Sequence, residues 1–350
     1  MRQDEGGGLR RLRRASIRQV AAAAGVSAST VSNVLNNPDL VATSTRRRVE
    51  DAMSEVGYVR NGAARQLRGA PSTIAGCLLL DTANPFFAEV SRGIEDRLTE
   101  AGYLLIVGST DVRFAQENKY LRMMEELGVR GILVNPSGSR LDRLVQLSRR
   151  GTPVVLVDHP QAGAELCAVA VDDVHGGGLV ADHLLALGHR RIAFLGSSAD
   201  VRSVGDRGAG LRCSLAAAGP DIAATLVEVR VPEPCTVEAA DSTVDRLLSL
   251  SPRPTAIVCF NDIVALGVLR GLRRRGVEVP DEMSVVGYDD VHFAEQLHPA
   301  LTTVRQPKYQ LGRTAAELLL AEGHPDHQHE EVRFTPELVV RASTSPPAAG

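Results

Sequence analysis

Residues 25–36 read GVSASTVSNVLN, and the order of apolar and polar side chains in this stretch decides the fold of the first part of the chain. Val31, Val34 and Leu35 recur at helical spacing and predict one buried stripe. Ser27 directly precedes the first apolar position and can cap the free N–H groups of the helix. The stretch therefore predicts a short helix with one packed face and one face of small side chains.

Two further helices are predicted around this one. Before it, Ser16 and Gln19 stand in the positions of a capping box, and Gly25 allows a sharp turn. After it, a third helix closes at Gly57, and its apolar stripe comprises Val49, Met53 and Val56. Two short helices joined by a glycine turn and braced by a third make a helix-turn-helix unit. Periodicity alone fits an ordinary three-helix bundle equally well, but Ser, Asn and Ala side chains can also read base edges in a major groove.

The charge distribution separates this head from the rest of the chain. Residues 1–70 hold twelve arginines against six acidic residues, a formal charge of +6, and the remaining 27 basic and 36 acidic residues give −9. The run RRLRR at 10–14 by itself predicts a solvated tail, so we expect residues 1–14 to be a disordered basic extension. A basic head on an acidic body indicates that the head meets a polyanion.

The segment SIRQVAAAAGVSASTVSNVLN and the later RRRVEDAMSEVGYVRNGAARQLRG closely resemble the DNA-binding head of the LacI/GalR (lactose-repressor) family. The resemblance implies a helix-turn-helix domain at residues 15–60 in which Ala28, Ser29 and Asn33 read bases. Asn33 replaces an arginine common in the family, so adenine is favoured over guanine there. Ala42 replaces the usual Ser or Thr cap of the third helix, and Thr43 or Ser44 is expected to cap instead. The further DNA contacts that the resemblance implies are Ser16, Ser27, Thr30, Ser32, Asn36, Tyr58 and Asn61.

Residues 61–71 resemble the hinge helix and linker of the same family. That hinge folds when two copies meet in the minor groove at the centre of an operator. Leu67 matches the leucine that wedges between base pairs, and Ala64 matches the small residue that lets the two hinges approach. An apolar wedge of this kind unstacks one base step and bends the duplex. The alternative is a plain linker in which Leu67 packs on the body.

From residue 72 the pattern changes to alternating strands and helices. Strand-like runs are predicted at 74–80, 103–109, 130–136, 153–158, 168–172, 191–196, 256–260 and 283–290. Such alternation predicts parallel sheets with helices on both faces, and two similar blocks predict two α/β lobes with a ligand cleft between them.

The family resemblance extends through this body and implies a type-I periplasmic-binding-protein-like core. Residues 72–343 would form the effector-binding and dimerisation domain, followed by a tail at 344–350. The first lobe would comprise about 73–171 plus 304–334, and the second 172–303 plus 335–343. The chain shows no heptad pattern after the second lobe, which in this family implies a homodimer rather than a tetramer.

Several polar and aromatic residues follow predicted strands at the ends that would face the cleft. Carboxylates and an arginine can pair with vicinal hydroxyls, and an aromatic face can stack on a sugar ring. The predicted effector-binding residues are Asp81, Phe86, Phe87, Asp158, Arg207, Asn261 and Asp289. Asn261 could instead cap a helix, Asp172 is expected to cap one, and Phe86 is equally well placed for core packing.

Other functional classes find less support. The chain carries no GxxxxGK[ST], GxSxG or HExxH motif and no GxGxxG after a strand, so we expect no enzyme, no catalytic residue and no cofactor. Five scattered cysteines without a CxxC pair predict reduced, mostly packed thiols. The segment HPDHQHEE (324–331) could hold a metal, but its polar neighbours favour a solvated loop and no metal.

The sequence as a whole predicts a DNA-binding transcriptional regulator of sugar uptake or catabolism genes, a repressor that binds a pseudo-palindromic double-stranded operator as a dimer. A basic N-terminus without an apolar run and the absence of about 20 consecutive apolar residues predict a cytoplasmic, nucleoid-associated protein with no membrane partner. An exported sugar-binding protein would share the body but not the head. A regulator controlled by a protein corepressor, rather than a sugar, stays open.

Overall fold

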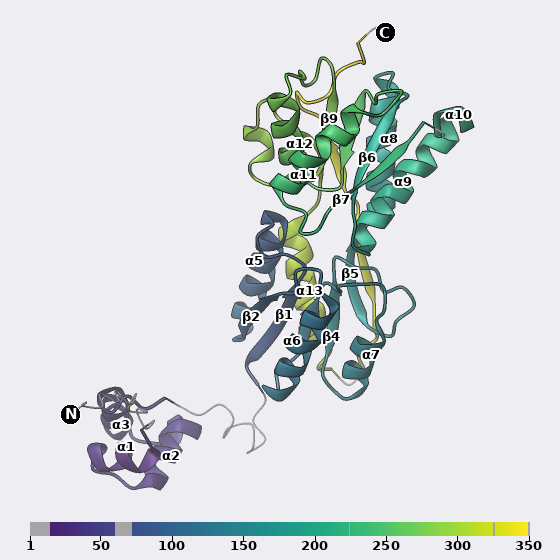
Figure 1. Cartoon of the computed structure of the whole chain (residues 1–350). Helices are drawn as coiled ribbons and strands as arrows, with labels where there is room; N and C mark the ends of the chain where they lie inside the picture. The colour runs from purple at the N-terminus through teal and green to yellow at the C-terminus, as the bar shows by residue number, and fades with distance from the viewer. Residues whose placement is uncertain (1–14, 60–71, 224, 325, 349–350) are drawn as a thin grey trace, which may run out of the picture. The chain divides into compact units, whose positions relative to one another are not determined.

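A computed structural model of the chain describes residues 15–59, 72–223, 225–324 and 326–348, which belong to two compact units, one within residues 1–70 and one within 71–350 (Figure 1). The predicted basic extension at 1–14 lies outside the described residues. So does the whole of the predicted hinge and linker at 61–71, with its residues Asn61, Ala64 and Leu67.

The head is a three-helix unit of the predicted kind. Its elements are α1 (Ile17–Ala24), α2 (Ala28–Asn36), the short 3-10 helix η1 (Pro38–Leu40) and α3 (Thr43–Glu55). Both sides of the capping box at Ser16 are formed, and Gly25 ends α1 with a left-handed φ of 61°. The fully buried Val20, Val31 and Val49 join the three helices in one core. The turn chemistry and the apolar stripes that the sequence contains are therefore the ones that build the unit.

One capping prediction in the head is wrong. Neither Thr43 nor Ser44 caps α3, because the helix already begins at Thr43 and the residue in the capping position is Ala42. An alanine side chain has no oxygen to accept a hydrogen bond, and no side-chain cap is formed.

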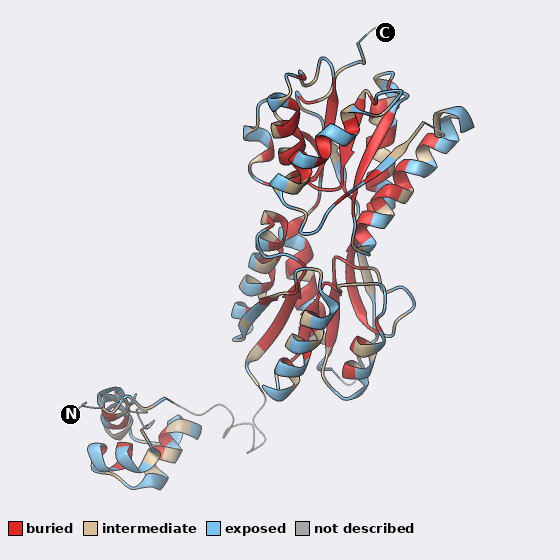
Figure 2. Cartoon of the chain, in the orientation of Figure 1, coloured by how far each residue is buried: buried red, intermediate tan, exposed pale blue. Residues whose placement is uncertain are grey.

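The body contains two six-stranded sheets, whose central strands are buried, as the red strands in Figure 2 show, while edge strands are partly exposed. The first has the order β11-β5-β4-β3-β1-β2 and is parallel throughout. Its strands are β1 (Ile74–Leu79), β2 (Leu104–Ser109), β3 (Ile132–Val134), β4 (Val154–Val157), β5 (Cys167–Val171) and β11 (Glu331–Phe334). Its helices are α5 (Pro85–Glu100), α6 (Phe114–Glu126), α7 (Asp142–Arg149) and α13 (Lys308–Ala321).

The second sheet has the order β12-β10-β9-β8-β6-β7, and only β12 runs antiparallel to its neighbour. Its strands are β6 (Ile192–Ser197), β7 (Val227–Val231), β8 (Ala256–Cys259), β9 (Ser284–Asp289), β10 (Thr302–Arg305) and β12 (Glu337–Val339). The helices of this lobe are α8 (Asp173–Ala186), α9 (Arg202–Ala218), the short α10 (Pro220–Ala223), α11 (Val237–Leu248) and α12 (Asp262–Arg274), and the 3-10 helix η2 (Ala294–Gln296) follows β9. All eight predicted strands are present. The chain crosses between the lobes after β5, after β10 and after β11.

Two boundaries in the structure differ from the predicted ones. The crossover predicted at residue 304 falls inside β10, which pairs with β9 up to Arg305. The tail predicted from residue 344 begins later, because the backbone N–H of Ser345 donates to the hydroxyl of Ser284 at 3.1 Å and its carbonyl lies 2.9 Å from Nε2 of His189. In both places the chain continues to hydrogen-bond along the second sheet.

Glycines allow the helices beside the cleft to pack closely. An added Cβ on Gly210 of α9 would lie 3.0 Å from the backbone nitrogen of Gly178 in α8, and closer still to the carbonyl group of Val174. Such contacts are tighter than van der Waals packing permits, so only glycine fits here. Because α8 and α9 lie in direct contact, the residues at their N-terminal ends are brought together.

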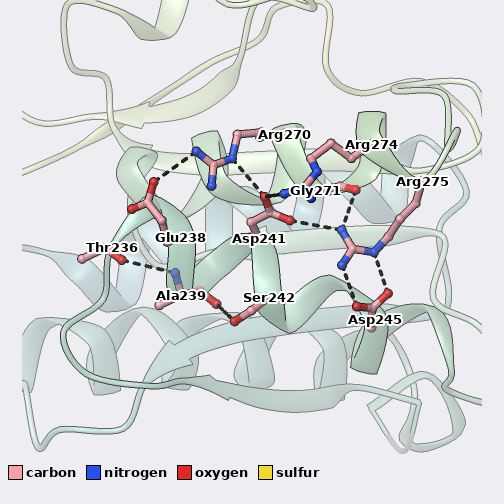
Figure 3. A network of polar contacts seen from close by, with 10 residues as sticks. All are labelled: Thr236, Glu238, Ala239, Asp241, Ser242, Asp245, Arg270, Gly271, Arg274 and Arg275. Carbon is pink, nitrogen blue, oxygen red and sulfur yellow. Dashed lines mark hydrogen bonds and ion pairs between the residues drawn. The ribbon is translucent and has the colours of Figure 1, made fainter.

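A network of charges joins the two helices α11 and α12 on the other side of the second sheet (Figure 3). Asp241 accepts hydrogen bonds from Arg270 and Arg274 at 3.0 Å each and from Arg275 at 3.1 Å. Asp245 adds two bonds of 2.6 Å with Arg275. Since both carboxylates belong to α11 and all three arginines lie on or just after α12, the network fixes the register of the helix pair.

Candidate DNA-reading face and effector cleft

The predicted reading residues share one side of α2. At 100° per residue, positions 28, 29, 32, 33 and 36 span about 140° of the helix surface. Ala28, Ser29 and Asn33 are exposed there, while Val31 and Val34 point into the head core. The structure therefore leaves a face of small side chains free for contact, and its role in base reading stays a prediction.

Hydroxyl groups cluster where α2 begins. Ser27 accepts the backbone N–H of Thr30 at 3.0 Å, and its oxygen lies 2.7 Å from that of Ser29 and 2.8 Å from that of Thr30. One turn on, the Asn36 amide donates to Ser32 at 3.2 Å. Free N–H groups and hydroxyls at a helix N-terminus suit phosphate oxygens.

The two remaining described residues of the predicted DNA contact set lie elsewhere in the head. Ser16 is the exposed N-cap of α1, and Tyr58 is half-buried against the head core. Exposed Arg18, Arg47 and Arg48 add positive charge to the unit.

In the body, the structure brings all seven predicted effector residues to the lining of one cavity of about 550 Å³, a size typical of small-molecule sites. Asp81, Phe86, Phe87 and Asp158 come from the first lobe, and Arg207, Asn261 and Asp289 from the second. They converge because the carboxyl ends of both parallel sheets open onto the same space.

Arg207 lines the cavity from the second lobe, and its guanidinium group already makes several polar contacts. Its Nε donates to Asp173 at 2.8 Å, and one Nη donates to the carbonyl of Phe260 at 2.7 Å. The guanidinium lies 3.8 Å from the centroid of the Tyr288 ring and 3.7 Å from Asp289. With only 6% of its surface exposed, Arg207 is the buried counterion of the cleft as well as a candidate ligand contact.

Three buried carboxyl groups surround this cation. Burial raises the pKa of Asp289 to about 6, although Arg207 and Lys308 oppose the rise. Burial also raises the pKa of Asp158 well above its usual value, as does the charge of Asp173. Asp158 accepts one hydrogen bond, from Asn135 at 3.3 Å, and its other oxygen is buried without a partner. That oxygen is the clearest open hydrogen-bonding position in the described part of the cleft.

Unusual backbone conformations aim these groups into the cavity. Asp158 and Asp289 stand at the ends of their strands with φ of 52° and 110°, and Asp111 and Val112 after β2 have φ of 50° and 56°. L-residues adopt positive φ at a cost, and such residues concentrate at functional sites.

The helix-capping and core-packing roles that the sequence also allowed for these residues are present in the structure. Asn261 caps α12 by accepting the backbone N–H of Val264 at 2.9 Å, and Asp172 caps α8 through His175 at 3.0 Å. Phe86 is 2% exposed and Phe87 7%, and both also belong to the first-lobe core. Asn261, Phe86 and Phe87 therefore line the cleft and support the fold at once.

Sequence reasoning missed the residues that hold the site together. Asp173 binds Arg207, Gln306 donates to Asp289 at 2.7 Å, and the Lys308 ammonium group donates to the carbonyl oxygens of Asp289 and Asp290 at 2.9 and 2.8 Å. The doubled Asp at the end of β5 was a signal for Asp173. Nothing in the linear pattern connects residues 306 and 308 with Asp289.

Comparison with known proteins agrees with this architecture. The family model for bacterial regulatory proteins of the lacI family matches residues 16–61, and that for a periplasmic binding protein-like domain matches 181–344. The HTH-type transcriptional repressor PurR of Photobacterium profundum is 35% identical over 332 residues, 94% of this chain and 98% of the relative. The HTH-type transcriptional regulator DegA of Bacillus subtilis is 33% identical over 95% of this chain and 98% of its own length.

Solved structures extend the comparison to ligands. A LacI family regulator from Enterococcus faecium with bound ribose is 31% identical with a TM-score of 0.71, covering 78% of this chain and 99% of that chain. The regulator CelR in complex with cellobiose is 28% identical with a TM-score of 0.68, covering 94% and 100%. The lac repressor dimer bound to operator and the anti-inducer ONPF is 26% identical with a TM-score of 0.78, covering 95% and 100%.

A helix-turn-helix head followed by a two-lobed periplasmic-binding-protein-like core defines a DNA-binding transcriptional regulator. Given the extent and identity of the match to its relatives, the chain belongs to the LacI family of bacterial regulatory proteins. The family and the fold class predicted from the sequence are confirmed. No helix in the described ranges is long and apolar enough to cross a membrane.

Proposed function

We propose that this protein is an operator-binding repressor whose affinity for DNA is set by a small, carbohydrate-like effector held between its lobes. The observation that carries the proposal is the convergence of seven side chains, drawn from both lobes, on one cavity of about 550 Å³. Ribose and cellobiose are the ligands bound to two of the similar regulators.

The chemistry of the cleft favours a hydroxylated ligand. The unpaired oxygen of Asp158 is a position for a hydroxyl group, and Asp81, Asn261 and Asp289 add oxygen acceptors around the same space. The edge-to-face pair Phe86 and Phe87, with centroids 5.0 Å apart, supplies an apolar wall for the carbon face of a sugar ring. A ligand that bridges both lobes can act only by binding one arrangement of the lobes more tightly than another.

On the DNA, two heads of a homodimer would read the two halves of a pseudo-palindrome through Ala28, Ser29 and Asn33. Leu67 would wedge at the central step, and this role stays a prediction because the residue lies outside the described residues. A repressor of similar fold has been solved as a dimer on its operator. Regulation of sugar uptake or catabolism genes follows from the proposed effector.

An effector screen tests the proposal directly. Purified full-length protein is tested by thermal shift against pentoses, hexoses, disaccharides and, as the competing planar class, nucleobases, and hits are measured by calorimetry. Asp158→Asn should weaken binding of the true effector about tenfold or more, because the one carbonyl oxygen of the asparagine is needed to accept from Asn135, and an NH2 group then replaces the acceptor that faces the ligand. The exposed Asp182→Asn on α8 is the matched control. Binding of nucleobases alone would overturn the sugar assignment, and an unchanged affinity of Asp158→Asn would overturn the role of the cleft.

A further inference from the structure

Four metal-ligating side chains meet at the edge of the first sheet opposite the effector cleft. Cys167 is the first residue of β5, Glu322 directly follows α13, and His327 and His329 precede β11. Because β5 and β11 are parallel neighbours, both strands begin at this edge, whereas the cleft lies at their far ends. These residues form the Cys167 cluster, and the prediction that their loop is simply solvated is wrong for His327, whose side chain is 12% exposed.

The ligand atoms of the cluster lie close together, all within 4.8 Å of one another. Cys167 Sγ is 3.0 Å from His327 Nε2 and 3.9 Å from His329 Nδ1. Glu322 Oε1 is 3.6 Å from His327 Nε2 and 3.1 Å from His329 Nδ1. Each histidine therefore presents one ring nitrogen to both the thiol and the carboxyl group.

These separations match the edges of a metal-centred tetrahedron. Zinc bonds of about 2.3 Å to sulfur and about 2.0–2.2 Å to nitrogen and oxygen place tetrahedral ligand atoms roughly 3.3–3.6 Å apart. The four distances from the histidine nitrogens to the thiol and the carboxyl group, 3.0 to 3.9 Å, bracket that range. Small rotations of the side chains would equalise them around a central ion.

Burial and charge also suit a dication. Cys167 is fully buried, and the side chains of Glu322 and His327 are 8% and 12% exposed, while His329, at 33%, leaves a path to solvent. A thiolate and a carboxylate together carry two negative charges, which a divalent ion neutralises. Without an ion, the buried thiol makes only weak sulfur contacts to the two imidazoles, and the ordinary hydrogen bond of the cluster joins His329 and Glu322 at 3.1 Å.

We propose that the Cys167 cluster is a binding site for one divalent transition-metal ion, and that Zn²⁺ is the ion it fits best. Sulfur and imidazole ligands exclude Mg²⁺ and Ca²⁺, which prefer oxygen, and one thiolate with two imidazoles and a carboxylate suits tetrahedral zinc. Four protein ligands leave no open coordination position, so the ion has a structural role. It ties the end of α13 to the beginnings of β5 and β11.

Metal binding at this site requires a proton to leave. A metal-bound cysteine is a thiolate, so the sulfur–metal bond replaces the S–H bond of Cys167 with release of one H⁺ to the buffer. Affinity for the ion should accordingly rise with pH.

The test uses the untagged full-length chain, stripped with a chelator and titrated with Zn²⁺ and, as a spectroscopic probe, Co²⁺. We expect one ion per chain, a thiolate-to-cobalt charge-transfer band, and visible bands of tetrahedral intensity. Saturating Zn²⁺ should raise the melting temperature by about 5 °C at a hundred times Kd, and Mg²⁺ should not. Calorimetry in two buffers of different ionisation enthalpy should show about one proton released from the thiol per ion.

Variants separate this site from adventitious binding. Cys167→Ser should abolish the charge-transfer band, and His327→Ala, at a partly exposed position that tolerates truncation, should lose the thermal shift. The matched control is His324→Ala, which removes an exposed imidazole of the same loop outside the cluster and should behave as wild type. A band that survives Cys167→Ser, equal losses in the His324 and His327 variants, or no binding of Zn²⁺ would overturn the proposal. None of these readouts depends on the effector or on DNA.

Discussion

Replacing Arg207 with methionine removes the cation at the centre of the effector cleft while keeping an unbranched apolar stem. The wild-type guanidinium bonds Asp173 and the Phe260 carbonyl and lies near Asp289, and it is almost fully buried. Removing one partner of a buried ion pair costs about 3–5 kcal/mol, because the remaining charge has lost its compensation. We therefore expect Arg207→Met to lower the free energy of unfolding of the body by about this amount near pH 8.

The pH dependence of this cost follows from the carboxyl groups. Burial raises the pKa of Asp158, Asp173 and Asp289 in the folded protein, and Arg207 opposes the rise in each. Without the guanidinium these folded-state pKa values rise further, so the folded variant retains protons that the unfolded chain has released. Its stability then falls more steeply with rising pH than that of wild type, by up to about 1.4 kcal/mol per pH unit for each carboxyl. The cost of the substitution should be about 1–2 kcal/mol smaller near pH 6 than near pH 8.

Urea denaturation of both proteins at the two pH values measures the difference. Arg212→Met is the matched control, since Arg212 lies on the same helix in an exposed pair with Glu228 and should contribute less than about 1 kcal/mol. A cost below about 1 kcal/mol, or one that does not grow with pH, would refute Arg207 as the counterion of the cleft. In conditions where the variant is folded, it should bind operator but no longer respond to effector.

Three further outcomes are expected. Gly210→Ala should lower the melting temperature, with overpacking of about 1–3 kcal/mol against α8, whereas Gly205→Ala on the same helix, where an added Cβ meets nothing within 4 Å, should not. Burial raises the pKa of Asp262 to about 8, so the free energy of unfolding should fall from about pH 4 toward pH 8, and Asp262→Asn should flatten that fall in urea denaturation. Asn33→Ala should weaken specific DNA binding about 5-fold to 150-fold in anisotropy titrations, with Ser54→Ala on α3 as an inert control.

The parts of the structure that follow from the sequence are those written in local patterns. The capping box at Ser16, the left-handed Gly25 and the apolar stripes of α1 to α3 are set by residues within a few positions of each other. Eight of the strands are continuous apolar runs, so their existence and their division into two lobes could be predicted. Residues at the ends of such strands meet at one sheet edge, which is why Asp158 and Asp289 could be assigned to the same cleft.

Contacts between residues far apart in the sequence could not be predicted, because no local pattern records them. Gln306 and Lys308 hold Asp289 from the chain's second crossover, and only the tertiary fold brings them there. Cys167 stands 155 residues before Glu322, and no sequence pattern shows that the two lie together. The histidine-rich loop was therefore predicted to be solvated. Four strands were not predicted, because β7, β10, β11 and β12 lack the continuous apolar run that marked the eight predicted strands.

The central claim is tested most directly by measuring how effector binding in the cleft and DNA binding by the head change each other's affinity. Affinity for labelled DNA from upstream of the gene is measured by anisotropy with and without the effector, and affinity for the effector is measured with and without that DNA. Linkage requires the two ratios to be equal, and a switch of useful size changes each about 5-fold to 150-fold. Equal ratios in that range are predicted. An effector that binds in the cleft and leaves the DNA affinity unchanged would contradict the account.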